Sequence, residues 1–169
     1  ALGADGVVAV RLDFNLHTWS ANVIEFLAIG TAVKSLDGGF RGAENRPFTS
    51  DLSGQDFWTL LNAGYRPLGL VLGNCVYNVG QSSSASSNDN QELTAPTQAL
   101  YDARELAMER MQVEAEALEA AGIVGVVVDE NNHNWGPGVI EFSAVGTAVV
   151  PIREDHHIAK PDLVLTVGD

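Results

Sequence analysis

The most regular feature of the hydrophobic pattern is an eleven-residue segment that occurs twice. Residues 23–33 read VIEFLAIGTAV and residues 139–149 read VIEFSAVGTAV, so nine of the eleven positions are identical at a constant spacing of 116 residues. Their β-branched and aromatic residues favour strands, and their alternation places apolar side chains on both faces. Each segment is therefore predicted to be a strand covered on both sides, with Gly30 and Gly146 marking a bulge or a close backbone approach.

The duplication continues upstream of this strand as the pattern D-x3-H-x-W. The residues of the two copies are Asp13, His17 and Trp19, and Asp129, His133 and Trp135. Apolar runs at 7–13 and 126–129 come before or overlap the pattern, and each is predicted to form the first strand of a β-hairpin. Further upstream, residues 3–13 face the shorter run 122–129, so three residues are expected to be missing from the second copy.

The chain between the two hairpins begins with the pattern of a short helix followed by a strand. The helix is predicted near 55–63, capped by Ser53 with Asp56 three residues later and closed by Gly64. The apolar run 68–79 is predicted to be the strand.

A long helix is predicted over 96–121, because this stretch has a proline at its start, no internal glycine or proline, and Gly122 as a stop signal. An apolar stripe at helical spacing is formed by Leu100, Ala103, Ala107, Met111, Ala115 and Leu118. The low-complexity run 80–91 before the helix is predicted to be a mobile loop. The apolar part of 161–169 is expected to add an edge strand.

These patterns divide the chain unequally. Residues 1–45 contain a hairpin and a linker, residues 46–152 contain a complete unit with its own strand, long helix and hairpin, and residues 153–169 form a tail. Because the first hairpin lacks the strand and helix that precede the second, the chain is expected to be a piece of a longer tandem-repeat protein.

Composition removes several classes of function. With 46% hydrophobic residues the chain can form a core, and 22 acidic against 9 basic residues give a net charge of −13. That charge argues against partners such as nucleic acid or anionic membranes, which require a basic surface. One cysteine, Cys75, excludes an internal disulfide and a multi-cysteine metal site. No run is long enough to span a membrane and no signal peptide is evident, so a cytoplasmic location is expected.

The first-copy sequence LGADGVVAVRLD at 2–13, the strand ending in GTAV, the long charged helix and the GLVLGN strand together resemble the YbjQ-like family, which is named for heavy-metal binding. The resemblance covers nearly all of 46–152 and part of 1–34. It implies an α+β fold of dodecin-like β-α-β-β modules whose subunits join through their sheets in a homo-oligomeric ring, commonly a pentamer. A tandem version implies that one chain supplies two modules.

The second copy departs from this family pattern at two places. Gly122-Ile123-Val124 replaces the Gly-Ala-Asp start, and a valine at 127 or 128 stands where the first copy has Arg11. Any role of that arginine is therefore absent from the second copy.

The duplicated Asp13/His17 and Asp129/His133 pairs are the leading candidates for metal ligands. Imidazole and carboxylate together suit a divalent transition metal such as zinc or nickel, with further ligands supplied by neighbouring modules. The alternative is that each pair fixes a hairpin turn, since duplicated residues also follow from duplicated structure. A weaker candidate is the acidic and histidine-rich tail, with His156 and His157 as donors, or simply as part of a solvated linker.

For three further residues, a structural role is favoured over a role as a ligand. Glu25 and Glu141 lie in the middle of apolar strands, where an ion pair or an inter-subunit hydrogen bond is favoured over a ligand role. Cys75 is expected to be a small buried hydrophobe.

No nucleophile elbow, phosphate-binding loop, dinucleotide fingerprint or zinc-protease motif is present, so the chain is not expected to be an enzyme. Two hypotheses follow: a ring-forming protein that binds a metal ion or small ligand between modules, or a structural oligomer without a bound ion.

Overall fold

The computed structural model describes residues 3–17, 23–36, 39, 41–78, 94–131 and 139–154, which form an α+β fold with two three-stranded sheets. The elements are β1 (Gly6–His17), β2 (Val23–Val33), the 3-10 helix η1 (Ala43–Asn45), β3 (Phe48–Thr49), α1 (Gly54–Asn62), β4 (Tyr65–Asn78), α2 (Thr94–Ala117), β5 (Gly122–Asn131) and β6 (Val139–Pro151). One sheet has the order β2-β1-β3 and the other β4-β6-β5. No helix within the described ranges has the length and hydropathy needed to cross a membrane.

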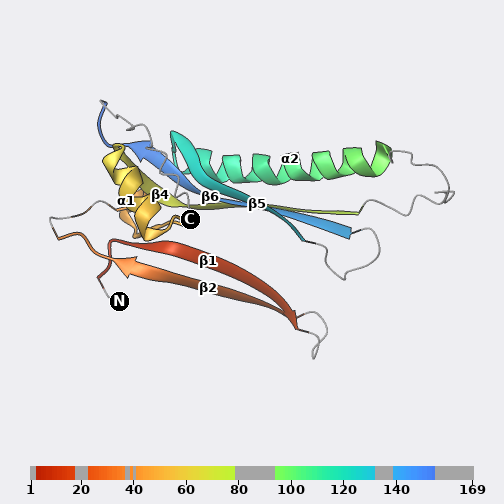
Figure 1. The fold of residues 1–169 in the computed structure, drawn as a ribbon, viewed down its shortest axis with the longest axis horizontal. Coiled ribbons are helices and arrows are strands. Elements are labelled where there is room, and N and C mark those ends of the chain that lie inside the picture. The colour runs from red at the N-terminus through yellow and green to blue at the C-terminus, as the bar shows by residue number, and fades with distance from the viewer. Residues whose placement is uncertain are drawn as a thin grey trace, which may run out of the picture.

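The β4-β6-β5 sheet lies between helix α2 and the β1–β2 hairpin (Figure 1). The predicted apolar stripe of α2 is confirmed, because Ala103, Ala107 and Met111 are almost completely buried against the sheet. The helix and the sheet approach closely at Gly73 of β4, where an added Cβ would lie 1.9 Å from the carbonyl oxygen of Ala107. The small residues of both elements therefore set the distance between the two layers.

The short helix α1 forms as the sequence predicts. The Ser53 hydroxyl accepts a hydrogen bond from the backbone N–H of Asp56 at 3.1 Å, which satisfies one of the free donors at the start of the helix. Gly64 follows the helix with φ +86°, a conformation that glycine adopts without strain. The predicted loop 80–91 and the tail strand at 161–169 lie outside the described residues.

Helix α2 ends earlier than the sequence predicts. Its last residue is Ala117, and Glu119, not Gly122, takes the left-handed conformation that ends the helix (φ +56°). The N–H of Ala120 donates to the carbonyl of Ala115 at 3.0 Å, which closes the last turn. Gly122 instead begins strand β5.

The two hairpins have the same strand register. Gly6 pairs with Val33 just as Gly122 pairs with Val149, and each first strand has a bulge two residues further along. The spacing of 116 therefore holds from Gly6 onward without a gap, so the expected loss of three residues is wrong. The expectation aligns Gly3 with Gly122 because both are glycines, whereas the strand register aligns Gly6 with Gly122.

Each bulge faces a glycine of the second strand, as predicted from the sequence. A Cβ added at Gly30 would lie 2.6 Å from Val7 Cγ1, and one added at Gly146 would lie 2.7 Å from Ile123 Cγ2. Both glycines are therefore needed for the close approach of the bulged strand.

The two hairpins differ in how far other elements bury their second strands, β2 and β6. The prediction of a strand covered on both sides holds for β6, whose Ala144 and Thr147 are fully buried on opposite faces. It is wrong for β2, whose Phe26 and Ile29 are 72% and 60% exposed. The physical reason is that β6 is covered by α2 on one face and by the segment with Ser50 at Thr147 on the other, whereas neither cover has a counterpart beside β2 in the described structure.

Candidate functional site

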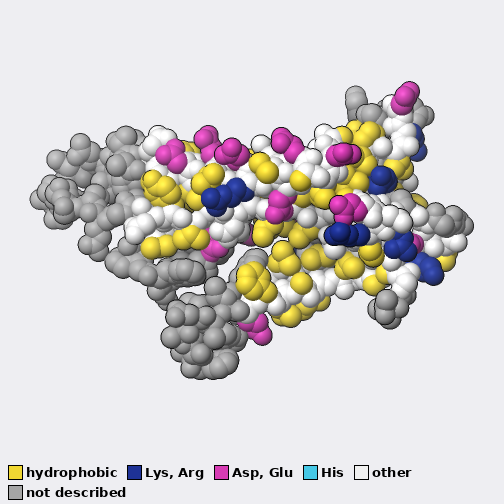
Figure 2. All heavy atoms as spheres, turned by 180° about the vertical axis from the view of Figure 1, so that it is seen from behind, with side chains coloured by type: hydrophobic (Ala, Val, Ile, Leu, Met, Phe, Trp, Pro, Cys, Tyr) yellow, Lys and Arg dark blue, Asp and Glu magenta, His cyan; other side chains and the backbone are white. Residues whose placement is uncertain are grey.

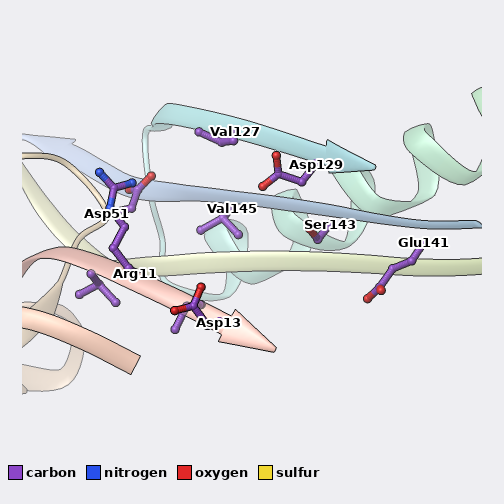
Figure 3. A pocket seen from close by; sticks show the side chains of 10 residues that line it. Arg11, Asp13, Asp51, Val127, Asp129, Glu141, Ser143 and Val145 are labelled. Atoms are coloured by element: carbon purple, nitrogen blue, oxygen red, sulfur yellow. The ribbon is translucent and has the colours of Figure 1, made fainter. Parts of the chain in front are cut away.

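The space between the two sheets contains a cavity of about 410 Å³, which we call the carboxylate cavity (Figure 3). Its lining comes from β1, from the segment after β3, and from β5 and β6. The lining residues are Val10, Arg11, Leu12, Asp13, Asp51, Val127, Asp129, Glu141, Ser143 and Val145. Four carboxylates and one guanidinium give this lining a formal charge of −3.

The cavity brings together Asp13 and Asp129, the two aspartates of the duplicated pattern. They occupy equivalent positions of the two hairpins, because Asp13 pairs with Leu27 and Asp129 pairs with Ser143 at the same spacing of 116 residues. Asp13 lies on β1 and Asp129 on β5, on different sides of the cavity (Figure 3). Two residues predicted from the sequence as separate ligands therefore line one site.

Asp51 is held at the cavity by a hydrogen-bond network with β6. Its carboxylate accepts a hydrogen bond from the hydroxyl of Thr147, a fully buried residue of β6. The Thr147 hydroxyl also lies 2.9 Å from the hydroxyl of Ser50 and accepts from the backbone N–H of Asp51 at 3.3 Å. This network fixes the Asp51 side chain at the edge of the cavity.

The segment that carries Asp51 also joins the two sheets. The N–H of Ser50 donates to the carbonyl of Val7 at 2.9 Å, and the N–H of Val10 donates to the carbonyl of Ser50 at 2.9 Å. Because the same segment binds β6 through Thr147, it sets the spacing between β1 and β6. The cavity therefore depends on a contact between parts of the chain that the sequence assigns to different units.

Glu141 lines the cavity from β6 and accepts a hydrogen bond from the side-chain amide of Asn74 on β4. The sequence favours an ion pair or a hydrogen bond to another subunit for this residue, and the structure shows a hydrogen bond within the chain. Asn74 can serve this role because it pairs with Ser143 in the β4–β6 ladder, next to Glu141. Glu25, the equivalent residue of β2, is exposed.

The histidine side chains predicted as ligands lie outside the part of the chain that the structure describes. The backbone of His17 ends β1 opposite Val23, and its side chain lies outside the described part of the structure. His133, His156 and His157 also lie outside it. Among the described residues, no three His, Cys, Asp or Glu side chains lie close enough together to hold a metal ion. The predicted metal site therefore stays a prediction.

The donors present favour one class of cation over another. Carboxylate oxygens are hard ligands, which suit cations that keep part of their water shell, whereas soft heavy metals prefer thiolates. Cys75 is 3% exposed and packs in the core with Phe142, which confirms its expected role as a buried hydrophobe. Its sulfur is not part of the cavity lining.

Arg11 and Asp51 are the functional candidates that sequence reasoning did not select. Arg11 contributes the basic group of the lining, and Val127 stands at its position in the second hairpin. No motif marks Asp51, because its position depends on Thr147, 96 residues away.

Comparison with known proteins places these features in context. A family model described as "Putative heavy-metal-binding" (YbjQ) matches residues 65–151, the range from β4 to β6. A protein of Mycobacterium tuberculosis named as an encapsulin nanocompartment protein is 44% identical over 155 residues. The aligned region covers 88% of this chain and 59% of that relative, so the chain spans less than two thirds of its length.

Proposed function

The chain belongs to the YbjQ family, and from this premise we propose that it binds a partly hydrated divalent metal ion in the carboxylate cavity. The observation that carries the proposal is the convergence of Asp13 and Asp129 on one cavity together with Asp51 and Glu141. The proposal assigns the cavity a binding role and no catalytic one.

The size and charge of the cavity support this assignment. About 410 Å³ accommodates a cation together with several water molecules, each of which takes about 30 Å³ in the liquid. Carboxylates that stand apart from one another can hold such an ion through its water shell without direct coordination by all four groups. The histidines of the duplicated pattern, His17 and His133, are candidates for additional ligands.

Calorimetric titration of the purified chain with zinc, nickel, copper, manganese and magnesium tests the proposal. The double variant Asp13→Asn/Asp129→Asn should weaken binding by at least about tenfold, because it removes two anionic groups from the lining. The matched control is Asp102→Asn/Glu116→Gln, which removes the same charge from the exposed face of α2. His17→Ala/His133→Ala separately tests the histidines.

The absence of binding heat with all five ions would refute the proposal. Equal affinity of the wild-type chain and the Asp13→Asn/Asp129→Asn variant would place any metal ion elsewhere.

A specific contact favours a second function, that of a ring-forming structural protein. Residues 48–52 bind the outer edge of β1 through backbone hydrogen bonds, as those of Ser50 with Val7 and Val10 show. Strand β5 corresponds to β1, and its outer edge has no strand partner among the described residues. If the two hairpins are copies of one module, the contact of residues 48–52 with β1 joins one module to the next in a head-to-tail manner. The same contact, made between residues 48–52 of one chain and β5 of another, generates a ring when the rotation between successive modules adds up to a full turn.

The Mycobacterium tuberculosis relative is named as an encapsulin nanocompartment protein, and on the basis of that name we propose that this chain acts in association with a protein compartment. The ring is tested by light scattering of the purified chain, which should give the mass of a closed oligomer, a pentamer by the family resemblance. The mass should not change with a chelator if the oligomer itself is the function. A monomer at micromolar concentration would refute the ring.

A further inference from the structure

Strand β2 carries an exposed apolar surface whose equivalent in the second hairpin is buried. Phe26 is 72% exposed, whereas Phe142, the same residue type 116 positions later, is 7% exposed. Ala28 is likewise exposed, whereas its equivalent Ala144 is fully buried. Hydrophobic side chains gather over the β1–β2 hairpin at the lower edge of Figure 2.

The second hairpin shows what covers such a surface. Strand β4 pairs with the outer edge of β6, where Cys75 lies opposite Phe142. Helix α2 covers the face of β6 that carries Phe142 and Ala144, with Ala107 and Met111 in the same core. The equivalent edge of β2 has no strand partner among the described residues, and the first hairpin therefore lacks both a strand and a helix.

The backbone before β1 matches the backbone that links α2 to β5. Gly3 has φ +64°, and Glu119, 116 positions later, has φ +56° after the last turn of α2. The N–H of Asp5 donates to the carbonyl of Val33 at 2.9 Å, and the N–H of Ala121 donates to that of Val149 at the same distance. Residues 3–5 thus have the conformation of a segment that leaves a helix and enters a hairpin.

We propose that the exposed face and free edge of β2 are the docking site of a strand–helix segment of the β4–α2 type, which runs into β1 through Gly3. The Mycobacterium tuberculosis relative has ample length for such a segment, because about two fifths of it lies outside the region aligned with this chain. The docking site does not depend on whether the carboxylate cavity binds a metal ion.

A second copy of β2 fits this surface less well. Edge-to-edge pairing of two β2 strands would satisfy the free backbone groups, but the face that carries Phe26 and Ala28 would stay open. A strand with a following helix covers both the edge and the face, as β4 and α2 do for β6.

The test is a variant in which a copy of residues 46–116 is joined in front of Ala1, because position 117 corresponds to position 1 at the spacing of 116. Hydrogen–deuterium exchange of the peptides 23–33 and 139–149, which differ in mass, is then compared in the original and the extended chain. In the original chain 23–33 should exchange faster than 139–149. In the extended chain its exchange should slow to match that of 139–149.

The matched control carries Gly→Val at the copied position of Gly73, where any Cβ would collide with the helix. This control should leave 23–33 exchanging as fast as in the original chain, with 139–149 still protected. Fast exchange of 23–33 in the extended chain would overturn the proposal. Slow exchange of 23–33 in the original chain together with the mass of a dimer would also overturn it, in favour of a second copy.

Discussion

Truncating the same phenylalanine in the two hairpins should have very different effects on stability. Phe142 and Phe26 follow the same three residues, valine, isoleucine and glutamate, but they are 7% and 72% exposed. Removing a buried phenylalanine side chain costs the lost transfer free energy plus the cavity that is left. Phe142→Ala should therefore lower the free energy of unfolding by about 3–5 kcal/mol. Phe26→Ala removes little buried surface and should cost about 1 kcal/mol or less.

Urea unfolding followed by circular dichroism measures both values. The dependence of the free energy on urea should be unchanged in both variants if only the native contacts are altered. In a thermal scan, Phe142→Ala should lower the Tm by roughly 6–20 °C, since 1 kcal/mol corresponds to about 2–4 °C for a chain of this size. Equal losses for the two variants would refute the reasoning, because Phe26 would then have to be covered in solution.

Two further matched pairs test how the layers are held together. Gly73→Ala should lower the free energy of unfolding by about 2 kcal/mol or more, because its Cβ would lie 1.9 Å from a carbonyl oxygen of α2. Gly69→Ala should lower it by about 1 kcal/mol or less, because the atom nearest to its Cβ would be 3.4 Å away. Thermal unfolding measures both losses. Thr147→Val should cost about 1–3 kcal/mol in urea unfolding, because it leaves buried Ser50 without the hydroxyl 2.9 Å away. Thr31→Val, at the exposed equivalent position, should change stability by about 0.5 kcal/mol or less, and a similar cost at both threonines would contradict the proposed role of the network.

The sequence predicts the two helices and the longer strands of this fold, because these elements are encoded locally, but it does not predict η1 or β3, and β3 exists through its pairing with the distant β1. The alternating strands, the alanine stripe of α2 and the Ser53 cap are all readable from residue spacing, and the structure confirms them. The end of α2 is different. Glutamate gives no signal for a left-handed conformation, so the sequence predicts the helix end at Gly122, whose residue type is the usual signal, and not at Glu119.

The candidate site could be predicted only in part, because its residues come together through contacts between distant segments. The duplicated pattern identifies Asp13 and Asp129 as functional candidates. That both line one cavity depends on how the segment 48–52 joins β1 to β6. That junction depends in turn on Thr147, which is buried here, whereas its equivalent Thr31 is exposed. Identical residues thus have different roles in the two hairpins, because a sequence repeat fixes the local strand register and leaves the neighbours of each copy undetermined.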